Sequence, residues 1–234
     1  MATFVLVHGA WHGSWCWKRV RKALQAEGHD VYTPTLTGVG ERSHLISPQV
    51  DLETHVADVV NLIRWEELTE VALCGHSYGG CVITGAADRV AERIRALVYL
   101  DAFILEDGQS LHDVLPAEVA TGQRKAANER GNGWLVPPIT AEFFRVNPAD
   151  RAWVDAQCTP QPLATFSRPL RLGKSIAATK CTHILATGYE QSPFPPFHEI
   201  AKRKGWKALT IACGHDVMLD KPAELVAMLR DAAR

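Results

Sequence analysis

The fold is decided by one stretch of the sequence, which reads Val71-Ala72-Leu73-Cys74-Gly75-His76-Ser77-Tyr78-Gly79-Gly80. Its first four residues are apolar and predict a buried strand, and residues 79–90 predict a helix. Between the two stands a Gly-x-Ser-x-Gly motif, in which the chain reverses sharply so that the serine projects from the turn. The motif alone is common by chance, but its place between strand and helix favours a strained, nucleophilic Ser77.

On both sides of this stretch, short apolar runs alternate with helical segments. Strands are predicted at residues 4–8, 30–33, 70–74, 95–100, 183–187 and 207–212. Helices are predicted at residues 15–26 (capped by Ser14), 51–67, 79–90, 197–204 and 221–233. Such alternation predicts an α/β fold, with a mostly parallel six-stranded sheet and helices on both faces.

The alternation stops between residues 103 and 175. This segment is rich in proline and aromatic residues and contains no clear strand. It therefore predicts a mainly helical insertion, or lid. The predicted domain organisation is a core of residues 1–102 and 176–234 with a lid of residues 103–175.

A serine hydroxyl needs a base to take its proton before it attacks. Among the ten histidines, His215 stands directly after the last predicted strand and before the last helix. That place is at the carboxyl edge of the sheet, where open parallel sheets bind their ligands. His215 is therefore the candidate base. His76 is expected to be structural, and His8 and His12 are expected to shape the loop after the first strand.

The carboxylate that would orient His215 has several candidates. Asp101 ends the strand at residues 95–100 and so lies at the same edge of the sheet, whereas Glu190 is the acidic residue after the next-to-last strand. A carboxylate on the far nitrogen of His215 would fix its tautomer. We favour Asp101, with Glu190 as the alternative and with Asp216 or no acid as further options.

Acyl transfer through a tetrahedral intermediate needs N–H donors for the oxyanion. The sequence offers the N–H of Tyr78, directly after the serine, and that of Ala10, in the loop after the first strand. Aromatic side chains over a cleft would favour an apolar, aryl substrate. The candidate substrate contacts are Trp11, His12, Phe103, Trp134, Phe144 and Trp153.

Composition narrows the class of partner. The net charge is −1 and no basic run follows the pattern of phosphate binding, so the expected partner is a small-molecule substrate and not nucleic acid. No apolar run approaches the ~20 residues that span a membrane, and the first residues lack the pattern of a signal peptide. We therefore expect no membrane association and a cytoplasmic location.

The six cysteines are scattered and form no Cys-x-x-Cys pair. This spacing favours buried free thiols and predicts no metal site. The oligomeric state is left open by the sequence, and a homodimer is one alternative.

Three motifs resemble the plant methyl-esterase and hydroxynitrile-lyase branch of the α/β-hydrolases. They are His8-Gly9-Ala10-Trp11-His12-Gly13, Gly75-His76-Ser77-Tyr78-Gly79-Gly80 and Cys213-Gly214-His215-Asp216. The chain is more similar still to a bacterial set of that branch, which includes hydrolases of aryl carbamates and of pyrethroid-type esters. The resemblance implies the α/β-hydrolase fold and serine-dependent cleavage of an ester, carbamate or amide through an acyl-enzyme, without a cofactor.

Two departures from that branch matter. Those enzymes place an aspartate after the next-to-last strand, where this chain has the Glu190 region. The lyases carry a lysine directly after the catalytic histidine and a threonine beside the oxyanion loop, where this chain has Asp216 and Gly9. An aspartate would repel the cyanide that the lysine stabilises, which disfavours a lyase. A hydroxynitrile lyase, a cofactor-free oxygenase and a non-catalytic ligand receptor are the alternatives.

Overall fold

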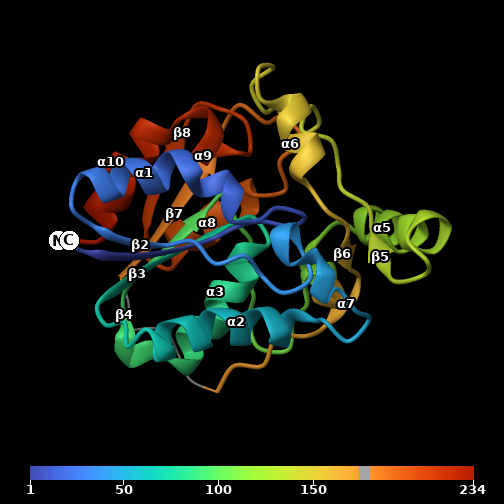
Figure 1. Ribbon diagram of the computed structural model, residues 1–234, viewed down its shortest axis with the longest axis horizontal. Coiled ribbons are helices and arrows are strands. Elements are labelled where there is room, and N and C mark those ends of the chain that lie inside the picture. The colour runs from blue at the N-terminus through green and yellow to red at the C-terminus, as the bar shows by residue number, and fades with distance from the viewer. Residues whose placement is uncertain (174–179) are drawn as a thin grey trace.

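A parallel sheet forms the centre of the molecule, which the computed structural model describes over residues 1–173 and 180–234 (Figure 1). Its strands are β1 (Thr3–Val7), β2 (Asp30–Tyr32), β3 (Val71–His76), β4 (Ile94–Leu100), β7 (Lys180–Ala186) and β8 (Lys207–Ile211). They lie in the order β2-β1-β3-β4-β7-β8, and each neighbouring pair is parallel. The predicted six-stranded α/β sheet is confirmed.

Helices cover both faces of this sheet. Helices α1 (Lys18–Ala26) and α10 (Pro222–Ala232) pack together on one face, and α2 (Leu52–Trp65) and α3 (Gly79–Arg89) pack together on the other (Figure 1). Helix α8 (Pro195–Arg203) packs against β7 and β8. Strands β1, β3 and β4 are buried along most of their length, as expected for parallel strands with helices on both sides.

Several local predictions differ from the structure. Residues 14–17 form a 3-10 turn (Ser14–Trp17) before α1, so Ser14 lies inside this turn and does not cap the helix. Its N–H donates to Thr35 Oγ1 at 2.7 Å. Two further 3-10 turns span Gly40–Leu45 and Ala91–Arg93. A short helix, α9 (Val217–Asp220), was not predicted and precedes α10.

The segment after β4 leaves the sheet and crosses its carboxyl edge. It contains α4 (Leu111–Val114), α5 (Ala117–Arg130), β5 (Leu135–Val136), α6 (Arg151–Gln157), β6 (Gln161–Pro162) and α7 (Ala164–Ser167). The expectation of no strand was wrong, since β5 and β6 form an antiparallel pair. Two-residue strands, one of them containing a proline, have no periodicity that a sequence could reveal. The predicted lid boundary at residue 175 lies outside the described residues.

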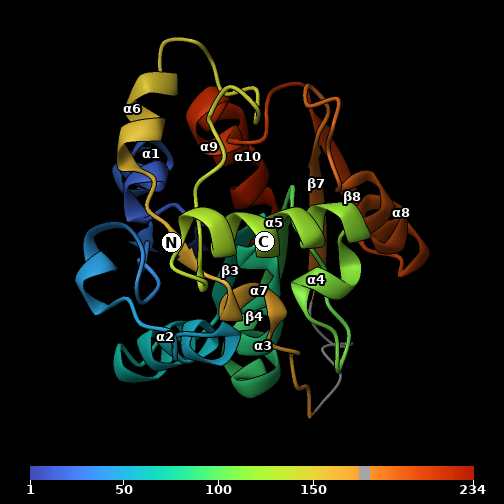
Figure 2. The ribbon, with the colours of Figure 1, turned by 90° about the vertical axis from the view of Figure 1, so that its right-hand side faces the viewer.

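The chain ends and the inserted segment lie at opposite edges of the sheet. Both termini lie at the amino ends of the strands (Figure 1), whereas the inserted helices lie in front of the strands when the molecule is viewed from the other end (Figure 2). The carboxyl edge, where the motif residues gather, therefore faces the insertion. Within the described residues, each helix is too short or too polar to cross a lipid bilayer.

We predict that Asp51→Ala lowers the free energy of unfolding by about 1 kcal/mol. Asp51 Oδ1 accepts the Thr54 N–H at 3.0 Å, and the two residues form a capping box at the start of α2. Thermal and urea unfolding measure the change, and Asp51→Asn is the matched control because asparagine also caps helices. Equal stability of the alanine variant and the wild type would contradict the capping role.

Candidate active site

Ser77 occupies a tight turn between β3 and α3. Its backbone has a φ of 55°, in the left-handed region that residues other than glycine rarely adopt. A Cβ on Gly75 would lie 2.4 Å from the oxygen of Gly79, and a Cβ on Gly79 would lie 2.7 Å from the oxygen of His8. Both motif glycines are therefore required by close backbone approach, as the sequence predicted for a nucleophile elbow.

Left-handed backbone recurs around this turn. Trp11, Asp101 and Arg145 have φ values of 64°, 42° and 58°. Such conformations cost about 1–3 kcal/mol each and persist where the surrounding structure enforces them, which is typical of functional sites.

Asp101 and His215 form a buried hydrogen bond beside the turn. His215 Nδ1 lies 2.7 Å from Asp101 Oδ2, and the Ala186 N–H donates to Asp101 Oδ1 at 3.1 Å. Asp101 is fully buried and His215 is 3% exposed. The backbone at the end of β7, the strand beside β4, thus holds the Asp101 carboxylate in place.

Burial sets the protonation of this pair. It raises the pKa of Asp101, although the Ala186 N–H favours the carboxylate, and it lowers the pKa of His215 to about 4. Each charge is penalised by the low dielectric of the interior, so the pair holds one proton between Nδ1 and Oδ2. His215 Nε2 is therefore unprotonated at neutral pH.

The backbone and ring of His215 are fixed on all sides. Its N–H donates to the Phe144 oxygen at 2.9 Å, and His76 Nε2 donates to the His215 oxygen at 3.0 Å. Its ring stacks on Phe194, with centroids 5.0 Å apart and planes 10° apart. Within the described part of the chain, neither His215 Nε2 nor Ser77 Oγ forms a hydrogen bond. Catalytic hydrogen bonds of this kind commonly tighten only when substrate binds.

The two other candidate acids lie elsewhere. The Glu190 side chain is 88% exposed and faces Arg145 at 3.9 Å. Asp216 is fully buried and accepts from His12 Nε2 at 3.1 Å. Of the three carboxylates considered, Asp101 is the one that reaches His215.

The loop after β1 offers one free N–H beside the turn. The neutral His8 ring donates from Nδ1 to the Gly9 oxygen at 2.8 Å and accepts the Leu36 N–H at Nε2 at 3.0 Å. Burial lowers the pKa of His8 to about 3, which favours this neutral form. The Trp11 N–H donates to Gln161 Oε1 at 2.9 Å. In residues 1–173 and 180–234, the N–H groups of Ala10 and Tyr78 have no acceptor.

An aromatic cluster surrounds His215. Phe144 lies 5.1 Å from the His215 ring and 6.2 Å from Trp11, and Phe103 lies 4.7 Å from Phe194. Of the predicted substrate residues, Phe144 thus contacts His215 directly, while Trp11 and Phe103 contact rings that pack on His215. Tyr189 and Phe194 also pack on His215 and were not predicted, because the sequence of the loop after β7 does not show which of its side chains turn toward His215.

The remaining predicted substrate residues form contacts with other parts of the protein. Trp153 packs against Trp15 at 5.0 Å and is 37% exposed. Trp134 pairs through its oxygen with the Leu163 N–H, and no contact to Ser77 or His215 is found in the described chain. His12 is buried and both of its nitrogens are hydrogen-bonded within the protein, and its role as a substrate contact stays a prediction.

His12 and Asp216 form a second buried pair. His12 Nδ1 donates to the Ala10 oxygen at 2.7 Å while Nε2 donates to Asp216 Oδ2. Burial disfavours both charges, but their mutual attraction outweighs it. This attraction raises the pKa of His12 well above its usual value and holds the pKa of Asp216 well below its usual value.

Ligand atoms of His76, His215 and Asp216 lie within 4.8 Å of one another, a spacing that a metal could use. The same residues already bond the His215 oxygen, Asp101 and His12, respectively. These bonds join the three side chains into a hydrogen-bond network, in which His76 Nδ1 and Asp216 Oδ1 have no partner among the described residues.

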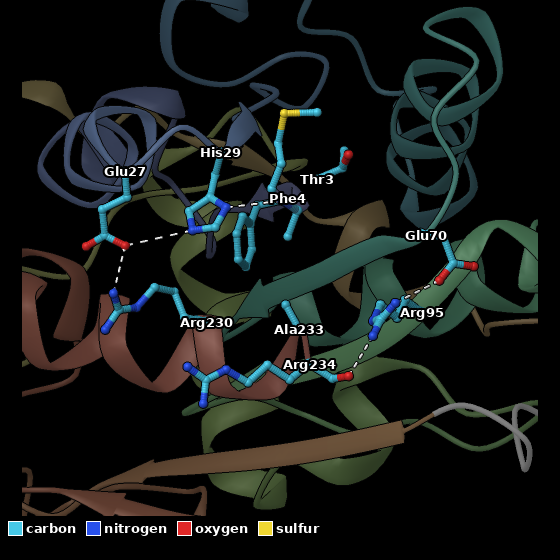
Figure 3. Close-up of a pocket in the computed structure, with 11 residues that line it drawn as sticks. Thr3, Phe4, Glu27, His29, Glu70, Arg95, Arg230, Ala233 and Arg234 are labelled. Carbon is cyan, nitrogen blue, oxygen red and sulfur yellow. Dashed lines mark hydrogen bonds and ion pairs between the residues drawn. The ribbon is translucent and has the colours of Figure 1, made fainter.

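Several cavities in the described part of the chain lie outside the elbow. One of about 850 Å³ lies at the amino edge of the sheet beside both termini (Figure 3). Its charged groups are paired, as Arg95 is with Glu70 and Arg230 is with Glu27. A smaller one of about 220 Å³, lined by Phe143 and Tyr189 among others, lies beside the aromatic cluster.

Comparisons with known proteins agree with this geometry. Residues 4–228 match the model of the alpha/beta hydrolase family. The chain belongs to the α/β-hydrolase family. The resemblance inferred from the sequence motifs is confirmed.

Two similar relatives of this α/β-hydrolase bear enzyme names. It is 50% identical over 239 residues, 98% of each chain, to a carbendazim hydrolyzing esterase of Nocardioides sp. (strain SG-4G). It is 33% identical over 185 residues to putative methylesterase 14 of Arabidopsis thaliana, covering 76% of this chain and 53% of that protein.

Solved structures show the same fold. An extracellular alpha/beta-hydrolase from a Paenibacillus species superposes with a TM-score of 0.87 at 26% identity, covering 100% of both chains. A pyrethroid hydrolase from Sphingobium faniae JZ-2 superposes with a TM-score of 0.73 at 20% identity, covering 99% of this chain and 97% of that one.

We predict that Asp216→Asn reduces the free energy of unfolding most between about pH 4 and 6.5. The stabilisation from the depressed Asp216 pKa is present above the unfolded value of about 3.9 and is lost as the pH falls through the folded value. The stabilisation from the raised His12 pKa is present below about 6.5 and is lost as the pH rises through the folded value.

Urea unfolding of wild type and variant across this pH range measures the difference. Asp231→Asn, an exposed carboxylate that faces Lys207, is the control and should change stability much less. A difference between Asp216→Asn and wild type that did not vary with pH would contradict the buried ion pair.

Proposed function

We propose that this chain is a serine hydrolase that cleaves small apolar aryl esters or carbamates through an acyl-enzyme. The observation that carries the proposal is the buried 2.7 Å hydrogen bond between His215 Nδ1 and Asp101 Oδ2 beside Ser77 on its strained turn. A nucleophile, a base and an orienting acid on separate elements are the constellation that acyl transfer requires.

In the proposed first half-reaction, Ser77 Oγ attacks the substrate carbonyl carbon while His215 Nε2 takes its proton. The imidazolium that forms is stabilised by Asp101, which also keeps Nδ1–H in place. The carbonyl oxygen becomes an oxyanion and accepts from the free N–H groups of Ala10 and Tyr78. Collapse breaks the bond to the leaving group, which receives the proton from Nε2.

In the second half-reaction, His215 Nε2 takes a proton from water, and the resulting hydroxide attacks the acyl carbon. The tetrahedral intermediate uses the same two N–H donors. Its collapse releases the acid and returns the proton to Ser77 Oγ. This mechanism needs no cofactor.

The aromatic cluster supports an aryl substrate. Phe144, Tyr189 and Phe194 lie within 5.8 Å of the His215 ring, between centroids, so the base works in apolar surroundings. Flat aromatic groups pack well against such rings. The Nocardioides relative is named for the hydrolysis of carbendazim, an aryl carbamate ester, and we propose a small substrate of that class here.

The position after the base supports hydrolysis over cyanide elimination. Asp216 is an anion that accepts from His12. It offers no positive charge to a cyanide leaving group.

We expect wild-type protein to hydrolyse p-nitrophenyl butyrate and aryl carbamates, and Ser77→Ala to lose this turnover by about 10⁴-fold or more. Initial rates on a panel that also includes p-nitrophenyl acetate and an aryl methyl ester measure this and rank the substrates. Wild-type protein that turns over none of the panel would contradict the proposed function. Faster turnover of short aliphatic esters than of aryl ones would contradict the substrate class.

We predict that Asp101→Asn lowers kcat by about 10⁴-fold, because an amide at this place favours the wrong tautomer of the base. Glu190→Gln is the matched control and should leave kcat within about 2-fold, since exposed ion pairs contribute little. Circular dichroism checks that both variants fold. Equal losses in the two variants, or none in Asp101→Asn, would contradict the assignment of the acid.

A further inference from the structure

The buried pair of His12 and Asp216 joins the two sides of the proposed reaction centre. Asp216 directly follows the base, and His12 lies two residues after Ala10, the proposed oxyanion donor. The ring of His12 bonds Asp216 Oδ2 at 3.1 Å on one side and the Ala10 oxygen at 2.7 Å on the other. His12 is 3% exposed and Asp216 is fully buried, so water does not compete for these bonds.

The bond to the Ala10 oxygen locks one peptide of the oxyanion loop. In the peptide between Ala10 and Trp11, the Ala10 oxygen accepts from His12 Nδ1, and the Trp11 N–H donates to Gln161 Oε1 at 2.9 Å. In the preceding peptide, between Gly9 and Ala10, the Gly9 oxygen accepts from His8 Nδ1. That preceding peptide carries the Ala10 N–H, so His8 holds it directly, and His12 fixes the peptide that follows it. The left-handed φ of 64° at Trp11 is held by the same bonds.

We propose that His12, held as a cation by Asp216, is a positioning residue that orients the Ala10 N–H toward the oxyanion. The inference rests on the proposed serine-hydrolase function and adds to it a residue that never touches the substrate.

His12 must carry a proton on both ring nitrogens, because its ring faces two acceptors, the Ala10 oxygen and Asp216 Oδ2. A neutral imidazole has one N–H and could satisfy either the Ala10 oxygen or Asp216, but not both. The ring also stacks on Trp15, with centroids 4.9 Å and planes 18° apart, which suits a buried imidazolium. The other titratable groups that face it are Cys158, with Sγ 4.0 Å from Nδ1, and the rings of His76, His8 and His215.

Pairing also controls the charge beside the base. A lone buried Asp216 anion would favour the protonated form of His215 and repel the oxyanion. Because His12 neutralises it, the site keeps a neutral base and a donor loop that carries no opposing charge.

Two substitutions at the same position separate the two bonds. In His12→Asn, the amide nitrogen stands near the place of Nδ1 and can donate to the Ala10 oxygen, but it does not reach Asp216. In His12→Gln, the amide nitrogen stands near the place of Nε2 and can donate to Asp216, but not to the Ala10 oxygen. A purely structural role of the pair predicts similar effects of both variants.

We expect His12→Gln to lower kcat for p-nitrophenyl butyrate by about 10- to 100-fold with KM within about 2-fold. Loss of a whole oxyanion donor costs about 10²–10³-fold, and misorientation costs less. His12→Asn should lose less kcat than His12→Gln, because its oxyanion loop stays bonded, and the loss that remains comes from the unpaired Asp216 beside His215. Inhibition by phenylboronic acid, whose tetrahedral adduct on Ser77 places an oxygen in the same hole, should weaken in parallel with kcat.

His29 provides the matched control. Its Nδ1 accepts the Ala2 N–H at 3.1 Å at the amino edge of the sheet (Figure 3), far from the carboxyl edge. His29→Gln and His29→Asn should leave kcat and phenylboronic acid affinity unchanged. Thermal unfolding of all four variants checks that each is folded at the assay temperature. Equal kcat values in folded His12→Asn and His12→Gln would overturn the proposal.

One readout requires neither a variant that folds nor an active enzyme. Long-range ¹H–¹⁵N correlation of the histidine rings at pH 7.5 should show both nitrogens of His12 protonated. A His12 ring that is neutral at this pH would overturn the proposal whatever the activity. Wild-type protein with doubly protonated His12 but no Ser77-dependent turnover would instead contradict the proposed function.

Discussion

The buried hydrogen bond between His215 and Asp101 is the interaction on which the rest of the site depends. It joins the loop after β8 to the end of β4, two segments that are 114 residues apart in the sequence. Because β4 and β7 are neighbours, the Ala186 N–H meets the other oxygen of Asp101 and holds the carboxylate in place. The sheet order therefore determines which carboxylate can orient the base.

Buried histidines organise the surroundings of this bond, and each does so through a different protonation state. His8 and His76 are neutral and use one N–H each to hold a backbone oxygen, of Gly9 and of His215. His12 has a raised pKa and donates on both sides. A ring nitrogen buried without water has a fixed role, and such rings therefore set the direction of the peptides that line the site.

The sequence predicted those features that a local pattern encodes. The turn at Ser77 followed from glycines between a strand and a helix, and His215 followed from its place after the last strand. Asp101 could be favoured because the end of a parallel strand lies at the same edge of the sheet as the turn. The choice against Glu190 needed the structure, since the path of the loop after β7 decides whether that side chain points to the base or to solvent.

Features that depend on long-range packing could not be predicted. The partner of His12 lies 204 residues away, and no periodicity links the two positions. The stacking of Phe194 on His215 depends on how the loop after β7 folds back over the last strand. The pair β5 and β6 is too short to leave an alternation in the sequence.

The central claim is that Ser77, activated by His215 and Asp101, carries the acyl group during turnover. Rapid mixing with p-nitrophenyl butyrate, acid quenching and mass spectrometry of peptides test it most directly. The account predicts a butyryl group on the peptide that contains Ser77 in the wild type, and none on that peptide in Ser77→Ala. Turnover of the ester without an acyl group on Ser77, or with the group on another residue, would contradict it.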